Sequence, residues 1–190
     1  MKLRIRLLII TFFAPFCLSA NAAPDSEIPD YETRYDQFIK SASFEPLNKA
    51  LKECEEHFKR NINLPMKLPQ ISFTHQMAVC IRDKNGTNSM LEISHLNQYD
   101  GNHHYSIRVN PLETKFTKFP FDQDVIKVYT LKDGSKAIYG TTRKRRNEKA
   151  SFNLLVFEKG NLQYTLSIDA DIEGVVTADS LVQIAESVMD

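Results

Sequence analysis

The side chains best suited to chemistry in this sequence are four histidines. They are His75, His95, His103 and His104. When residue 97 is set opposite residue 103 in a predicted hairpin, His95 lies opposite Tyr105 with His103 diagonal to it, whereas His104 points to the other face. Two histidines on one face could begin a metal site, but a zinc site needs a third ligand. The chain has no His-Glu-x-x-His or Cys-x-x-Cys motif. We therefore expect no metal and no cofactor.

Nucleophilic and acid–base catalysis have little support in the sequence. There is no Gly-x-Ser-x-Gly elbow, and neither Cys54 nor Cys80 lies in a motif that lowers a thiol pKa. The carboxylates lie at turns or at alternate strand positions, where solvated acids are usual: Glu92, Glu113, Asp122, Asp124, Glu158 and Asp169. We predict that the protein is not an enzyme. The alternative is a secreted hydrolase whose carboxylates or histidines meet only in the folded chain.

The first 23 residues have the three-part pattern of a secretory signal peptide. A basic start at residues 1–6 precedes an apolar run and the small-residue signature Ala20-Asn21-Ala22. The apolar run is short for a bilayer and Pro15 interrupts it, so a retained anchor is the lesser alternative. Cleavage near Ala22/Ala23 removes three basic residues and no acidic one, which leaves 21 basic and 24 acidic residues and a net charge of −3. We expect a secreted protein with no stable transmembrane segment and no nucleic-acid partner.

Two cysteines remain after this cleavage, Cys54 and Cys80. In an exported protein they are a candidate disulfide, which would add about 3 to 4 kcal/mol to stability. The favoured interpretation is nevertheless two buried free thiols. Cys54 lies on the apolar stripe of a predicted helix, whereas Cys80 lies on the strand face opposite Met77, Val79 and Ile81. A helix that covers those three residues cannot reach Cys80.

The periodicity predicts one α+β domain over residues 31–190, after a flexible leader at residues 24–30. Apolar residues at helical spacing predict two N-terminal helices, one over residues 31–39 and one that begins after Ser43. Alternating patterns and turn signals predict a meandering antiparallel sheet of about seven strands. A helix from Thr177 to about residue 189 closes the domain.

The last predicted hairpin is the most apolar part of the mature chain, with its turn at Lys159-Gly160-Asn161. Setting residue 158 opposite residue 162 aligns two sets of side chains on one face: Phe152, Leu154 and Val156 with Ile168, Leu166 and Tyr164. Leu155 and Phe157 then point the other way, so we expect the hairpin to be buried on both faces. The C-terminal helix would cover one of these faces.

Two predicted loops are candidate partner-binding surfaces. Their residues are Phe116, Phe119 and Phe121 in the first loop and Arg143, Lys144, Arg145 and Arg146 in the second. The three rings could form an exposed lip, or they could fold back onto the core. The basic run could grip an anionic polymer or lipid surface, or it could be a solvated loop tip that discourages strand pairing. It lacks the interleaved aromatics of a single-strand nucleic-acid site.

Several segments stand out together: Leu64-Pro65, Leu68-Pro69, and residues 71–75, 131–134, 154–158, 164–168 and 181–187. Together they resemble an uncharacterised extracytoplasmic domain family of spore-forming Gram-positive bacteria. That family occurs in secreted proteins, lipoproteins and segments tethered to anti-sigma factors. The resemblance implies an extracytoplasmic location and an antiparallel α+β domain, and it implies no catalytic residues.

The function we predict is that of a secreted, non-catalytic cell-envelope protein that binds a protein, a lipid or an anionic wall polymer. The export signal, the missing catalytic motifs and the two unusual loops support this prediction. Besides the hydrolase, a regulator or inhibitor of an envelope enzyme remains an alternative.

Overall fold

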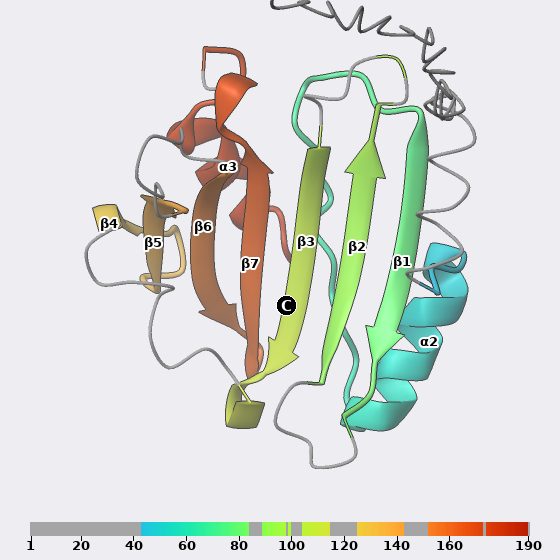
Figure 1. Cartoon of the computed structure of the whole chain (residues 1–190). Coiled ribbons are helices and arrows are strands. Elements are labelled where there is room, and N and C mark those ends of the chain that lie inside the picture. Colours follow the sequence, from blue (N-terminus) through green and yellow to red (C-terminus); the bar gives the residue numbers. More distant parts are fainter. Residues whose placement is uncertain are drawn as a thin grey trace, which may run out of the picture.

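The fold is an antiparallel sheet with helices on one side. The computed structural model describes residues 43–83, 89–97, 99, 104–114, 125–142, 152–172 and 174–189. Seven strands form one sheet in the order β1-β2-β3-β7-β6-β5-β4, and every neighbouring pair is antiparallel (Figure 1). The strands are β1 (His75–Ile81), β2 (Met90–Leu96), β3 (His104–Pro111), β4 (Val125–Thr130), β5 (Lys136–Thr141), β6 (Phe152–Lys159) and β7 (Leu162–Asp169). The predicted α+β class and antiparallel sheet are confirmed.

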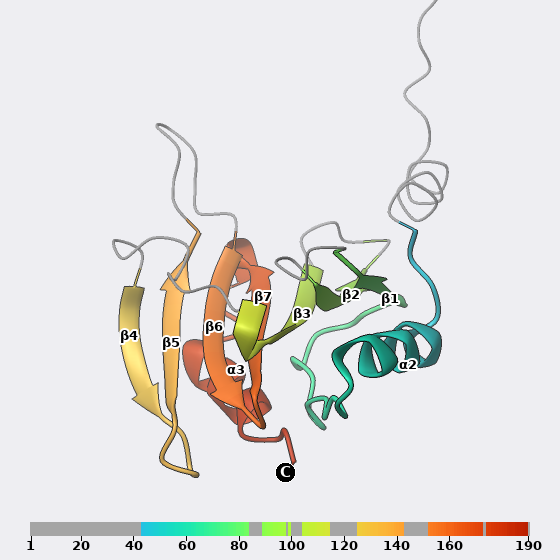
Figure 2. The ribbon, with the colours of Figure 1, turned by 90° about the horizontal axis from the view of Figure 1, so that it is seen from below.

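In the described part of the chain, two α-helices pack on the same face of the sheet, as the view from below shows (Figure 2). Helix α2 (Leu47–Phe58) lies against β1 and β2, and helix α3 (Ala178–Ala185) lies against β6. Two short 3-10 turns, η1 (Leu112–Thr114) and η2 (Ala170–Ile172), follow β3 and β7. The predicted helix over residues 31–39 and the signal segment lie outside the described residues. Among the described residues, no helix is long and apolar enough to cross a membrane.

The core lies between this helix-covered face and the two helices. Its sheet side consists of alternate residues from six strands: Ala78, Cys80, Leu91, Ile93, Tyr105, Ile107, Val109, Ala137, Tyr139, Leu155, Phe157, Tyr164, Leu166 and Ile168. Ala50, Cys54 and Phe58 of α2 and Leu181, Ile184 and Ala185 of α3 close it from the helical side. Burial of this apolar surface is the main term that holds the sheet and helices together.

The pairing predicted for β2 and β3 is confirmed. Leu91 pairs with Val109, Ile93 with Ile107, and His95 with Tyr105. The prediction succeeded because both strands alternate apolar and polar residues cleanly, and a shift by one residue would move every apolar side chain to the wrong face.

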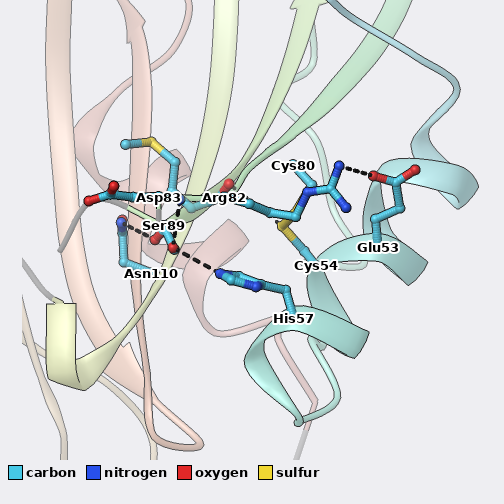
Figure 3. Close-up of a disulfide and its surroundings, with 9 residues drawn as sticks. Glu53, Cys54, His57, Cys80, Arg82, Asp83, Ser89 and Asn110 are labelled. Atoms are coloured by element: carbon cyan, nitrogen blue, oxygen red, sulfur yellow. Dashed lines mark hydrogen bonds and ion pairs between the residues drawn. A yellow bond between two sulfur atoms is a disulfide. The ribbon is translucent and has the colours of Figure 1, made fainter. Parts of the chain in front are cut away.

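The expectation of free thiols at Cys54 and Cys80 is wrong. Helix α2 covers the face of β1 that carries Ala78 and Cys80, whereas Met77 points to the helix-free face. The two cysteines form a disulfide with a Cα–Cα distance of 5.4 Å (Figure 3). The prediction took the more apolar face of β1 as the buried one. The face that α2 covers instead carries two small residues, Ala78 and Cys80, which are 0% and 9% exposed.

The register predicted for the last hairpin is wrong by one residue. Leu155 pairs with Leu166, and Phe157 pairs with Tyr164, so these side chains share the core face under α3. The turn has two residues, Gly160 and Asn161, both with positive φ (56° and 65°). A two-residue turn of this kind matches the twist of the strands and closes the hairpin between Lys159 and Leu162, not one residue earlier.

The C-terminal helix begins as predicted but ends sooner. The Thr177 side chain accepts a hydrogen bond from the backbone N–H of Ser180, which caps the first turn. The helix stops at Ala185, four residues before the predicted end at residue 189. Val188 then leaves the helix and forms an isolated antiparallel bridge with Pro65.

Candidate functional site: a cavity beside the C-terminal helix

The candidate site lies where residues 65–70 are hydrogen-bonded to the turn that follows α3. The backbone N–H of Met66 donates to the carbonyl of Ser187, and the N–H of Lys67 donates to the Ser187 hydroxyl oxygen at 3.1 Å. The same hydroxyl donates to the carbonyl of Ile184 at 2.6 Å. One serine therefore joins the extended segment to the helix, and the segment cannot drift away from α3 without breaking these bonds.

The hydrogen-bonded segment and the helix border an open cavity of about 410 Å³. Its lining residues are Lys67, Leu68, Pro69, Gln70, Val175, Val176, Ser180, Gln183 and Ile184. Pro69, Val176 and Ile184 are buried and form an apolar floor, whereas Leu68 and Val175 at the rim are 45% and 66% exposed. The accessible surface of the whole lining is more polar than apolar, so these buried side chains supply only its smaller, apolar part.

The polar side of the lining supplies hydrogen-bond donors and one positive charge. Ser180, Gln70 and Gln183 contribute a hydroxyl and two amides. Lys67 is the only ionisable residue in the lining, and in the described part of the chain its ammonium makes no ion pair. Lys67 is exposed, so its ammonium is solvated and can attract an anion only modestly.

Among the described residues, the acids and histidines considered as catalytic groups are not part of the cavity lining. Glu92 binds Arg108 on the helix-free face, and Glu113 binds Arg60 at the surface. The Arg60 hydrogen bond is the first cause that holds the pKa of Glu113 below its usual value. Among the described residues, no three His, Cys, Asp or Glu side chains lie close enough to hold a metal ion.

His104 faces away from the core, as predicted. Its backbone N–H donates to the Asp169 carboxylate at 2.7 Å, and its ring meets Phe152 edge-on at 5.7 Å. Burial lowers the pKa of His104. His103 lies outside the described residues.

His95 is a core residue. Its ring contacts Tyr105 (centroids 5.5 Å apart) and Phe73 (5.3 Å), and its Nε2 atom bonds the Gln76 amide at 2.9 Å. Burial lowers the pKa of His95 to about 4, so the ring is neutral at pH 7. The Nδ1 atom of His95 and the hydroxyl of Tyr105 are buried and have no hydrogen-bond partner among the described residues. This histidine packs in the core and has no contact with solvent that would suit an acid–base role.

A serine–histidine pair that the sequence did not suggest lies near the disulfide (Figure 3). The Nε2 atom of His57 is 3.0 Å from Oγ of Ser89, and the backbone N–H of Asp83 also donates to that Oγ. The Asn110 amide donates to the Ser89 carbonyl. Ser89 is only 2% exposed, and a nucleophile must reach its substrate. The pair is therefore structural: its hydrogen bond joins α2 to the residue that precedes β2.

The two loops predicted to bind a partner lie outside the described residues, with Phe116, Phe119 and Phe121 in the first and Arg143, Lys144, Arg145 and Arg146 in the second. The cavity was not predicted. The one sequence feature near it is the repeated Leu-Pro pair, Leu64-Pro65 and Leu68-Pro69. These prolines indicate only that the segment is not helical.

A comparison of the chain with family models, with curated proteins and with solved structures found no match. The resemblance described from the sequence therefore stays a prediction.

Proposed function

We propose that this protein is a secreted, non-catalytic binding module of the cell envelope that holds an anionic group attached to an apolar chain, as in a lipid. The cavity beside α3 is its binding site. The observation that carries this proposal is the lining itself, which in the described part of the chain has one ammonium without an ion pair, three neutral hydrogen-bonding side chains and a few buried apolar residues.

Export is supported by two features of the chain. The signal-like order of residues 1–23 predicts secretion, and the Cys54–Cys80 disulfide suits an oxidising compartment. Neither feature identifies the ligand, so the ligand class rests on the cavity alone.

A binding role fits the cavity better than hydrolysis does. The hydrolase alternative needs two acids, or a histidine with an acid, in one cleft. Among the described residues, the lining contains no acid and no histidine. A wall polymer with many sugar hydroxyls also fits less well, because the described lining offers Pro69, Val176 and Ile184 but no aromatic ring on which a sugar could stack.

The test is calorimetric titration with three probes: octanoate, 1-octanol with the same chain length, and acetate with the same carboxylate. Octanoate supplies both the charge and the apolar chain, whereas the other two supply one each. We expect octanoate to bind most tightly. Lys67→Gln should weaken octanoate binding about two- to fivefold, the effect of a partly exposed charge pair, and should leave 1-octanol binding unchanged.

The matched control is Lys52→Gln, which removes the same charge from the solvated face of α2, where Lys52 is 77% exposed. It should bind octanoate like the unaltered protein. Equal binding of octanoate and 1-octanol, or an equal loss in both lysine variants, would refute a specific anion site at this cavity.

A further inference from the structure

The two edge strands of the sheet differ in whether another described segment bonds to their outer side. At the β1 edge, the backbone N–H of Glu45 donates to the carbonyl of Ala78 at 2.8 Å, and the N–H of Ala78 donates to the carbonyl of Glu45 at 3.0 Å. The segment that leads into α2 therefore covers β1 with a bridge of its own. At the opposite edge, β4 pairs with β5 alone in the described part of the chain (Figure 1).

Strand β4 is unusually apolar for an open edge. Ile126 is 60% exposed, Val128 is 54% exposed and Val125 is 38% exposed. Edge strands are normally kept from pairing by charges, prolines or short length, because their free N–H and C=O groups are a template for another strand. β4 has a bulge between Val125 and Lys127 and one charge, Lys127, whose ammonium lies 4.3 Å from the ring centroid of Tyr129.

The residues of β4 favour one alignment of two paired copies over another. In a symmetric antiparallel pair, a residue on the two-fold axis lies opposite itself, and its neighbours pair across the axis. An axis at Lys127 would set two ammonium groups directly opposite each other, which is unfavourable. An axis at Val128 sets valine against valine, and it places each Lys127 opposite the partner's Tyr129, whose ring attracts a cation.

We infer that β4 is a homodimer interface, in which two copies of this chain join their sheets through antiparallel β4 strands centred on Val128. The partner is a second copy because, in this alignment, the residues of β4 supply both the apolar contact and the favourable lysine–tyrosine contact for each other. This inference is independent of the proposed ligand site, since β4 and α3 lie on different parts of the fold. The contact is a few residues long, so the dimer is weak and forms at high protein concentration.

Cysteine cross-linking tests both the interface and its register. Directly opposed residues of an antiparallel pair have Cα atoms about 4.5 to 5.5 Å apart, within the range that a disulfide can bridge. Under mild oxidation, Val128→Cys should give a covalent dimer in high yield at millimolar protein. Lys127→Cys should give little, because its own copies are offset along the strands. A reversed preference, or equal slow cross-linking of both variants, would overturn the centred pairing.

Sedimentation over a concentration series provides a readout without new cysteines. The unaltered chain should shift toward dimer as its concentration rises to about 1 mM. Val128→Lys should abolish the shift, because it sets like charges opposite each other at the axis. The control Ile81→Lys changes an exposed apolar residue of the other edge strand (38% exposed) and should leave the shift intact. A chain that stays monomeric throughout, or the same loss in both variants, contradicts the inference.

Discussion

Removal of the Cys54–Cys80 disulfide should destabilise the protein by an amount that the loop length sets. The two cysteines are 26 positions apart, so the bond closes a loop that the unfolded chain would otherwise sample freely. The chain-entropy relation gives about 3.5 kcal/mol for a loop of this length at 25 °C. Both side chains are buried, at 0% and 9% exposure. Replacing both cysteines with alanine therefore adds a packing loss of roughly 1 kcal/mol.

The assay is equilibrium urea unfolding of three forms: oxidised protein, reduced protein and the Cys54→Ala/Cys80→Ala variant. The reduced form separates the cross-link from the packing loss, because it keeps both sulfur atoms. We expect the oxidised form to unfold at a clearly higher urea concentration, with a free-energy difference of about 3 to 4 kcal/mol from the reduced form. A difference below about 1 kcal/mol, or two titratable thiols in the unreduced native protein, would show that the loop is not closed as described.

Three further predictions concern the core and the last hairpin. Stability should fall as the pH drops from about 6.5 toward 4, because the unfolded His95 takes up a proton in that range while the folded one, with its pKa lowered to about 4, does not. His95→Gln should flatten this part of a stability-against-pH curve. Tyr105→Phe should raise the free energy of unfolding by about 1 kcal/mol, because it removes a buried hydroxyl that has no partner; a loss of 1 kcal/mol or more would mean that the hydroxyl is bonded. Gly160→Ala should cost about 1 kcal/mol in urea unfolding, because φ at Gly160 is +56°. Gly174→Ala, which has open space around the added Cβ and no positive φ, is its control and should be neutral.

The sequence predicted the parts of the fold in which one signal dominates. The β2–β3 register followed from clean alternation, which sets Leu91 and Ile93 beside Tyr105, Ile107 and Val109. The β6–β7 register did not follow, because β6 carries apolar residues on both faces and either face could be set beside the apolar face of β7. Only the backbone conformation at Gly160 and Asn161 decides that pairing.

The face of β1 was predicted wrongly for a related reason. Hydrophobicity favoured the face with Met77, but α2 packs closely only where small side chains allow it, over Ala78 and Cys80. Which face of a strand a helix covers depends on the sizes of the side chains that meet. The sequence pattern of one strand does not show the shape of the helix that packs on it.

The candidate site could not be predicted from local sequence. Lys67 and Gln70 precede the sheet, whereas Ser180 and Gln183 belong to the last helix. The bond that brings the two segments together, from the N–H of Lys67 to the Ser187 hydroxyl, joins residues 120 positions apart. Periodicity assigns each segment an element, but it does not say which distant segment lies beside it.

The most direct test of the central claim is a methyl NMR titration of the protein with octanoate. If the ligand occupies the cavity, the methyl signals of Val176 and Ile184 on its floor should shift and saturate with one dissociation constant. The methyl signals of Ile107 in the core and of Val128 at the β4 edge should stay unchanged. Shifts confined to exposed residues such as Val128, or no saturable shift at Val176 and Ile184, would contradict the account.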